Sequence, residues 1–423
     1  MTRAPSVLSY VDDYATFCSI RARAMGVTAM RLMVTRLMMV SVAAAVLTLA
    51  PAAAIRAGSV PDAKTSPIGS QVLIAGGEDL PGAALDSAEL YDPTAQTFTA
   101  LSSLMSEPRE HHTSTRINGT LILITGGENA VPPATPAGLY TADLFSSKTR
   151  SLTPTRDNMV SGHSRQTATL TKSGKVLIAG GLDNTGAVTG VAENFKNQKG
   201  GTFTVTSYPL RTKRYYHTAT KIKGGLVLLT GGIDPNGLVL QKAEIFNIAN
   251  GTFNYTLGNM INRRSNHTAT LLNNGNVLIT GGYNGNGVPQ NTAEIFNPST
   301  RNFTATVGPM NFPRAEHTAT LLQGGRVFIC GGVGTSQILS TAEIYDPTTG
   351  TFTTVGPKMT DSRAGHTATL LKNGTVLIAG GMDQSGAIVD TAEIYNSAGS
   401  SSFKATAHTM NAARRYHTAT LIQ

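Results

Sequence analysis

The residues best suited to chemistry in this chain recur at one spacing. A Met-x-x-x-Arg-x-x-His pattern repeats along the sequence, with Met310, Arg314 and His317 as its clearest copy. Guanidinium groups bind carboxylates through paired, charge-assisted hydrogen bonds. Neutral imidazole is a common metal ligand. The pattern therefore raises two candidate sites, one for an anion and one for a metal ion.

The candidate anion site consists of the arginines of this pattern. They are Arg109, Arg214, Arg264, Arg314, Arg363 and Arg414, with His163 in the odd unit. Each unit also carries one acid in a later segment: Glu89, Asp143, Glu193, Glu244, Glu294, Glu343 or Glu393. One cation and one acid per unit is typical of a repeated internal ion pair, which favours a scaffold role over a binding role. Both interpretations stay open, and these six arginines, with Tyr216 and Tyr416, are the candidate binding residues.

The candidate metal site consists of the histidines. They are His112, His217, His267, His317, His366 and His417, with Gln166 in the odd unit. Six symmetric copies do not provide the compact three or four ligands that a transition metal prefers. We therefore expect buried, hydrogen-bonded histidines and predict neither a metal nor a cofactor.

The element that must position these residues is a repeat of about fifty residues. An apolar run ending in Gly-Gly occurs seven times, at successive steps of 50, 54, 51, 50, 50 and 49 residues. The pairs begin at Gly76, Gly126, Gly180, Gly231, Gly281, Gly331 and Gly380. Such a period indicates a stack of similar units that bury their apolar faces against one another.

One repeat divides into four short strands separated by turn residues. The unit that starts at His267 predicts strands over 267–272, 276–280, 293–296 and 302–306. The segment Asn273-Asn274-Gly275 is a hairpin turn that tolerates positive φ. Four strands in each of seven units, without a helical pattern, predict an all-β, seven-bladed β-propeller of four-stranded antiparallel blades.

The two ends of the repeat array complement each other. The array starts at a second strand, 71–75, and stops at a first strand, 417–423. We expect the C-terminal strand to pair with the N-terminal blade and close the ring, which leaves no open strand edge between them. A fragment cut within a repeat is the alternative.

The order of motifs within a repeat resembles a known family. An apolar run, Gly-Gly, the segment Ala342-Glu343-Ile344-Tyr345-Asp346-Pro347 and then Phe352 resemble the kelch motif of kelch proteins and of the galactose oxidase propeller. The resemblance covers about residues 71–423 and implies that the first strand is innermost, so that the repeated arginines ring the mouth of a central channel. Kelch repeats usually carry Trp in the last strand. This chain has no Trp, and phenylalanine stands there in six repeats, with Leu152 in another.

The resemblance also suggests one enzyme to test. The galactose oxidase family places a copper-binding Tyr-His pair at this point of a blade, and Tyr216-His217 and Tyr416-His417 match that pair. The family also needs a Cys cross-linked to a Tyr. No Cys stands directly before a first strand of this chain. A copper oxidase is therefore an alternative supported by two dipeptides and by fold analogy.

Composition and the N-terminal segment limit the remaining functions. Charged residues make up 14% of the chain, and it has no Lys/Arg runs, which argues against nucleic-acid binding. Residues 1–57 have the basic, apolar and small-residue order of a signal peptide, or of a membrane anchor if they are not cleaved. We expect a linker over 58–70 and the propeller over 71–423. Cys330 is the only cysteine after residue 57, so no disulfide is expected in this part.

Two main functions follow from these observations. The first is an exported, non-catalytic monomer (secreted, periplasmic or on the cell surface) that binds a protein, a glycan or a small anion through the arginines and the loops near Asp234 and Tyr283. The second is a copper oxidase with its site on the same face. A structural surface spacer is a third. Chemistry specific to this chain should lie where the repeats disagree, as at His163, Gln166, Tyr216 and Tyr416.

Overall fold

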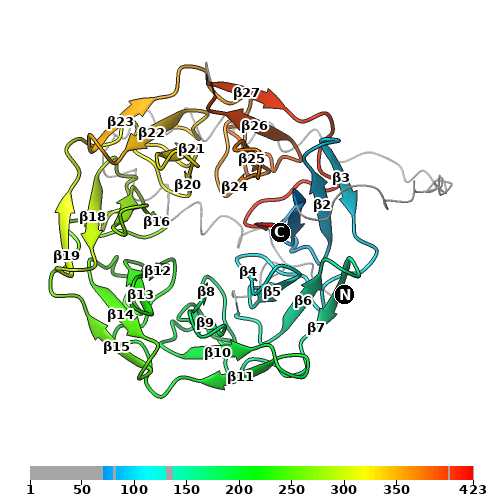
Figure 1. The fold of residues 1–423 in the computed structure, drawn as a ribbon, viewed down its shortest axis with the longest axis vertical. Coiled ribbons are helices and arrows are strands. Elements are labelled where there is room, and N and C mark those ends of the chain that lie inside the picture. The colour runs from blue at the N-terminus through cyan, green and yellow to red at the C-terminus, as the bar shows by residue number, and fades with distance from the viewer. Residues whose placement is uncertain (1–69, 80–81, 130–136, 399–400, 423) are drawn as a thin grey trace, which may run out of the picture. The chain divides into compact units, whose positions relative to one another are not determined.

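Seven four-stranded sheets form a closed ring in the computed structural model, which describes residues 70–79, 82–129, 137–398 and 401–422 (Figure 1). The segments expected to be a signal or anchor (1–57) and most of the linker (58–70) lie outside the described residues. Within the described residues, no helical segment is long and apolar enough to cross a membrane. The predicted seven-bladed propeller is confirmed.

Each sheet contributes one strand to each of four concentric layers. The innermost strands are β4 (Thr113–Arg116), β8 (Thr167–Leu170), β12 (Thr218–Ile222), β16 (Thr268–Leu271), β20 (Thr318–Leu321), β24 (Thr367–Leu370) and β28 (Thr418–Leu421). The second strands are β1 (Val72–Ala75), β5 (Leu121–Thr125), β9 (Val176–Ala179), β13 (Leu226–Thr230), β17 (Val277–Thr280), β21 (Val327–Cys330) and β25 (Val376–Ala379).

The outer half of each blade follows the same order. The third strands are β2 (Ala88–Asp92), β6 (Ala142–Ser146), β10 (Ala192–Lys196), β14 (Ala243–Asn247), β18 (Ala293–Asn297), β22 (Ala342–Asp346) and β26 (Ala392–Asn396). The outermost strands are β3 (Thr97–Ala100), β7 (Ser151–Pro154), β11 (Thr202–Val205), β15 (Thr252–Tyr255), β19 (Asn302–Ala305), β23 (Thr351–Thr354) and β27 (Ser402–Ala405). We number the blades by chain order, so that blade 1 is β28-β1-β2-β3 and blade 7 is β24-β25-β26-β27.

The C-terminal strand closes the ring, as the sequence predicts. Strand β28 pairs antiparallel with β1, from Val72 opposite Leu421 to Ala75 opposite Thr418. Innermost strands of neighbouring blades contact one another around the whole circle, including β28 with both β24 and β4. Blade 1 is therefore assembled from both ends of the repeat array.

The core lies between blades. Each of its seven clusters combines buried residues from two neighbouring blades, such as Leu177 of β9 with Val227 of β13. In six blades the phenylalanine of the outermost strand packs on an aromatic ring of the third strand, at 4.7 Å between centroids for Phe246 and Phe253. This contact occupies the place where a kelch repeat usually has Trp, so the smaller aromatic leaves the blade packing intact.

Antiparallel pairing puts all inter-blade loops at one end of the ring. Loops from second to third strands and from outermost strands to the next blade emerge at this end, which we call the loop face. The hairpins between first and second strands, and the turns between third and outermost strands, lie at the opposite end, the turn face. The candidate residues found in the sequence lie at or just below the loop face.

Candidate functional site

An ion pair lies inside six of the seven blades just below the loop face. In six blades the arginine that precedes the innermost strand contacts the acid of the third strand, with both side chains at most 2% exposed. The pairs are Arg109 with Asp143 (2.9 Å), Arg214 with Glu244 (2.8 Å), Arg264 with Glu294 (2.8 Å), Arg314 with Glu343 (2.9 Å), Arg363 with Glu393 (3.2 Å) and Arg414 with Glu89 (3.0 Å). The internal ion pairs expected from the sequence are therefore confirmed.

Each guanidinium also donates hydrogen bonds to backbone carbonyls of its own blade. Arg314 Nη1 donates to the carbonyls of Gly331 (2.6 Å) and Thr341 (3.2 Å), which end the second strand and precede the third. Burial lowers the pKa of Arg314, and the charge of Glu343 counteracts this shift. Because the charges are already paired and buried, their geometry supports a scaffold role. Ligand binding by the six arginines stays a prediction.

The odd unit reproduces this arrangement with a different side chain. His163 is fully buried, with its Nδ1 2.7 Å from the carbonyl oxygen of Gly180 and its Nε2 3.2 Å from Glu193. These two contacts match those that the arginines make to the Gly carbonyl and the acid. The imidazole can therefore replace the guanidinium while keeping both connections.

The repeated histidines join each blade to the one before it. His317 Nε2 lies 3.2 Å from Thr268 Oγ1 and 3.0 Å from Thr280 Oγ1, both in blade 5, while His317 precedes β20 of blade 6. Burial and Arg314 hold the pKa of His317 well below its usual value, so the imidazole is neutral. Among the described residues, no group of three His, Cys, Asp or Glu side chains could hold a metal ion. The expected hydrogen-bonded role of these histidines is confirmed.

The Gly-Gly pairs exist because the next blade occupies their side-chain space. A Cβ on Gly281 would lie 2.3 Å from the carbonyl oxygen of Arg314 and 2.8 Å from Cε1 of His317. The following glycine, Gly282, has φ +87° and donates its N–H to the same Arg314 oxygen at 2.9 Å. Gly-Gly, Arg and His therefore recur together because they form one inter-blade joint.

A ring of seven residues surrounds the channel mouth directly above these joints. It consists of the residues that stand one position before each repeated His or Gln: His111, Arg165, Tyr216, Asn266, Glu316, Gly365 and Tyr416. All seven have positive φ, from 50° to 54° for the six that are not glycine. Each N–H donates to the carbonyl of the ring residue in the preceding blade, from 2.9 Å at Tyr416 to 3.3 Å at Gly365. This closed circle of hydrogen bonds supports a backbone conformation that costs about 1 kcal/mol or more per residue.

Six of the seven ring residues, all except Glu316, line a cavity of about 290 Å³ at the mouth. Tyr416 stacks on His111, with centroids 4.0 Å apart, and its ring covers the place where a Cβ on Gly365 would lie. Tyr416 also donates its hydroxyl to Glu316 at 3.0 Å. The lining includes Tyr216 and Tyr416 but none of the six repeated arginines. The structure therefore brings the two candidate tyrosines together at the mouth and places the candidate arginines beneath it.

The two Tyr-His pairs are placed differently from a shared metal site. His217 and His417 have their Nε2 atoms 3.1 Å and 2.9 Å from Thr167 and Thr367 Oγ1, on opposite sides of the ring. Burial raises the pKa of the Tyr216 hydroxyl well above its ordinary value. The two Tyr-His pairs therefore do not converge on one metal position. The copper oxidase alternative is supported by the sequence alone.

A second set of charges lies at the mouth where blades 1, 2 and 3 meet. This mouth cluster consists of Glu78, Glu110, Glu128, Arg165 and Arg415. Arg165 pairs with Glu128 at 2.7 Å, and Arg415 pairs with Glu78. Glu110 is 8% exposed, and its carboxylate lies 3.9 Å from His111 Nε2. Burial, Glu78 and Glu128 raise the pKa of Glu110 to about 8.

Sequence reasoning missed the mouth cluster, although a signal was present. The residue after Gly-Gly is Glu in blades 1 and 2 but Leu182, Ile233, Val333 or Met382 in four others. That change of chemistry at a repeated position marks the cluster.

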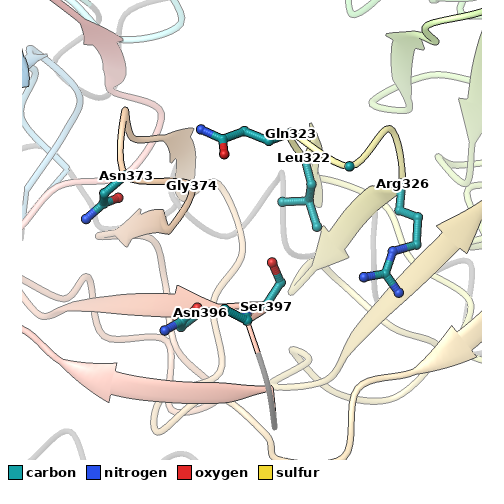
Figure 2. Close-up of a pocket in the computed structure, with 9 residues that line it drawn as sticks. Leu322, Gln323, Arg326, Asn373, Gly374, Asn396 and Ser397 are labelled. Atoms are coloured by element: carbon teal, nitrogen blue, oxygen red, sulfur yellow. Dashed lines mark hydrogen bonds between the residues drawn. The ribbon is translucent and has the colours of Figure 1, made fainter.

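A second hollow, of about 250 Å³, lies on the turn face between blades 6 and 7 (Figure 2). Arg326 and the amides of Gln323, Asn373 and Asn396 line it. It is made of turn residues and holds no buried charged group.

Comparison with protein families agrees with this architecture. The model of the KLHDC2/KLHL20/DRC7 Kelch-repeats domain matches residues 167–381 and 216–423, which together are more than half of the chain. The chain belongs to the kelch-repeat family. No curated protein matches it. Kelch propellers commonly bind proteins. Because residues repeated in every blade are explained by the scaffold, a binding surface is to be sought among the residues that differ between blades.

Proposed function

We propose that this kelch propeller is an exported, non-catalytic scaffold that binds a protein partner on its loop face. The supporting observation is where its exposed apolar side chains lie. Twelve large hydrophobic residues of the described chain are at least 37% exposed. Eleven lie in the loops between second and third strands, in the inter-blade loops, or at the strand ends that lead into these loops, Leu271 being the exception. Two of them, Leu257 and Val307, lie where an inter-blade loop meets the turn before the outermost strand of the next blade. Exposed apolar groups concentrated in one part of a surface are typical of protein interfaces.

Most of these residues form an arc over blades 3 to 5. The arc comprises Val205, Tyr208, Leu238, Tyr255, Leu257, Ile261, Val288 and Val307. Leu257 is 78% exposed and Val307 is 80% exposed. Among the described residues, blades 6 and 7 contribute none. The arc is therefore a property of particular blades and not of the repeat.

The state of the arginines favours a protein over a small anion as ligand. All six repeated guanidiniums are paired with acids inside the blades. A small anion would have to compete with a carboxylate already in place. A protein can instead cover the exposed arc and gain from the apolar area it removes from water.

Site-specific crosslinking tests the proposed partner face. A photoreactive phenylalanine at position 257 or 307 should yield one saturable protein adduct in the native host. The same group at position 271, on the turn face, is the matched control and should yield none. Excess purified propeller should compete for the adduct, whereas a Leu257→Ser, Val307→Ser variant should not. Equal labelling from both faces would contradict the proposal.

Export is tested by the fate of the N-terminal segment. The basic, apolar and small-residue order of residues 1–57 supports it. Cell fractionation combined with the intact mass of the chain should locate the propeller outside the cytoplasm, with a new N-terminus after the alanine run at 52–54. An uncleaved chain recovered in the cytoplasm would contradict export while leaving the partner face unaffected.

A further inference from the structure

We propose that the partner reaches the loop face of blade 4 through an acidic segment with apolar anchors. This inference rests on the proposed function and specifies the chemistry of its partner. The receptor is a blade 4 basic surface formed by Arg211, Lys213, Lys242 and Arg263, all exposed. Arg211 and Lys242 stand where every other repeat has an uncharged residue, and Lys213 and Arg263 share one position that is uncharged in the other five repeats.

Lys242 shows most clearly that the surface departs from the scaffold. The residue before the Ala-Glu or Ala-Asp of the third strand is a hydroxyl residue in five blades: Ser87, Thr141, Thr292, Thr341 and Thr391. There the hydroxyl contacts the buried arginine, at 3.0 Å between Arg264 Nη2 and Thr292 Oγ1 and 2.8 Å between Arg363 Nη2 and Thr391 Oγ1. In blade 4 this contact is absent, and an exposed ammonium takes its place. A scaffold contact has been exchanged for a surface charge.

Arg211 departs from the repeat in the same way. At this position Asn311 and Asn411 donate from their side chains to the third-strand acids Glu343 and Glu89, at 2.8 and 2.7 Å. Of these bonds to the acid, Arg211 keeps only the one from its backbone N–H to Glu244, at 2.8 Å. Its side chain runs outward instead.

The two arginines of the surface are held in fixed orientations. Arg211 Nε donates to the carbonyl of Phe253 at 2.7 Å and its Nη2 to Asn254 Oδ1 at 3.2 Å. Arg263 Nη1 donates to the carbonyl of Val239 at 3.0 Å. These contacts leave other N–H groups of each guanidinium for a ligand. Oriented forks of this kind suit carboxylates, which accept two parallel hydrogen bonds.

The charge balance of the surface supports an acidic ligand. Within residues 205–263, the loop face carries four cations (211, 213, 242 and 263) and one acid, Asp234, and Asp183 of blade 3 interacts electrostatically with Lys213, which gives the surface a net charge of +2. This count leaves out the buried Arg214–Glu244 pair and Lys221 and Lys223, which lie toward the turn face. Arg211 and Lys213 lie in one inter-blade loop, and no other inter-blade loop in the described chain has two exposed cations. A carboxylate-rich segment would complement it.

Apolar and aromatic groups lie between these cations. Arg211 and Lys242 both lie over the ring of Tyr255, at 5.8 and 5.3 Å from its centroid. In the loops that carry Arg211 and Lys242, Tyr208 is 56% exposed and Leu238 is 46% exposed. Interfaces rich in Tyr and Arg provide most of their affinity from a few such side chains. The occupant that fits is therefore a peptide segment that alternates acidic and apolar residues.

The test uses the repeat itself as a source of neutral replacements. In the triple variant Arg211→Asn, Lys242→Thr and Arg263→Ser, each new residue is one that another blade carries at that position, so folding should be unaffected. The control variant Lys221→Gln, Lys223→Gln and Lys372→Gln removes the same charge from the turn face. A synthetic peptide array with varied Asp/Glu and Leu/Phe content supplies the probe, followed by fluorescence anisotropy at increasing salt.

The expected result is binding of peptides that combine acidic and apolar residues, with an affinity that falls as salt rises. The triple variant should bind at least about tenfold more weakly, and the control variant should match the wild type. Equal binding of Asn/Gln analogues, or an unchanged triple variant, would overturn the inference. If the double variant Leu257→Ser, Val307→Ser abolishes binding and the triple variant does not, the partner surface of the proposed function is supported and the acidic character of the partner is contradicted. Sedimentation with phosphatidylserine vesicles, without peptide binding, would assign the surface to a membrane instead.

Discussion

Two adjacent residues, Arg414 and Arg415, belong to two different charge systems. Arg414 is 1% exposed and pairs with Glu89 in the arrangement that the other arginine blades repeat. Arg415 belongs to the mouth cluster, where it pairs with Glu78 and lies over the ring of Tyr416 at 5.0 Å. The first system is the same around the ring, and the second exists only near blades 1 to 3.

This difference separates residues that build a propeller from residues that distinguish one propeller from another. A group present in every blade is explained by the requirements of the blade, as the ion pairs and histidine joints show. Groups that occur once or twice, such as Glu110 and Lys242, are not explained by those requirements. Under the proposed function, such groups are the places where a partner would recognise this chain in particular.

Separate replacement of Arg414 and Arg415 by alanine should give the largest difference in the free energy of unfolding. Arg414→Ala leaves the buried Glu89 carboxylate without its cation and removes the bond to the Gly76 carbonyl (2.8 Å). We expect the free energy of unfolding to fall by about 3–5 kcal/mol. Arg415→Ala should cost only about 1–2 kcal/mol, because its side chain is 19% exposed. Chemical denaturation measures both, and similar losses would remove the distinction between the two systems.

The arrangement around His163 predicts that a histidine can partly replace the arginine of a repeated ion pair. Arg314→Ala should destabilise the protein to a similar extent as Arg414→Ala. Arg314→His should lose less, since His163 reaches both the Gly180 carbonyl and Glu193 from the equivalent position. Thermal unfolding of the two variants decides this. If His and Ala are equally damaging, the arrangement around His163 depends on its own blade and not on the repeat.

Regular features of this fold were predictable because each repeat confirms the others. Seven Gly-Gly pairs gave the blade number, and the chain ends predicted the pairing of β28 with β1. Pairing of the arginines with third-strand acids also followed, because six repeats carry one arginine and one acid each, and His163 takes the place of the arginine in the seventh. An incorrectly predicted strand in one repeat does not change the predicted fold, because the other six repeats show the same pattern.

Irregular features were not predictable to the same degree. The sequence shows that Glu78, Glu110 and Glu128 differ from their counterparts, but not that they meet across two blades. The positive φ of ring residues such as Tyr216 and Tyr416 was also hidden, because it is imposed by the circle of inter-blade hydrogen bonds. Local preference opposes this conformation, and tertiary structure decides it.

The histidine joints should make the repeated system sensitive to acid. Burial lowers the pKa of His112, His267 and His366 to about 3. Between about pH 6.5 and 3 the unfolded chain binds protons that these folded histidines do not, so stability falls as the pH drops. The double variant His267→Gln, His366→Gln introduces the residue that the odd unit carries as Gln166, and it should flatten this loss while preserving stability at pH 8. Urea midpoints across this pH range provide the measurement, and an unchanged slope would contradict neutral, buried imidazoles.

The mouth cluster should show the opposite dependence with a smaller amplitude. Glu110 has its pKa raised from 4.5 to about 8, so the folded protein keeps a proton that the unfolded chain loses between these values. This contribution to stability is present below pH 4.5 and declines as the pH rises toward 8. Glu110→Gln removes the titration and should stabilise the protein above pH 8 by on the order of 1 kcal/mol. Glu128→Gln is the matched control. It should destabilise the protein at the same pH, because Glu128 accepts from Arg165 and from Ser164 (2.8 Å). If both variants destabilise the protein equally, Glu110 is paired in solution and the mouth carries no surplus negative charge.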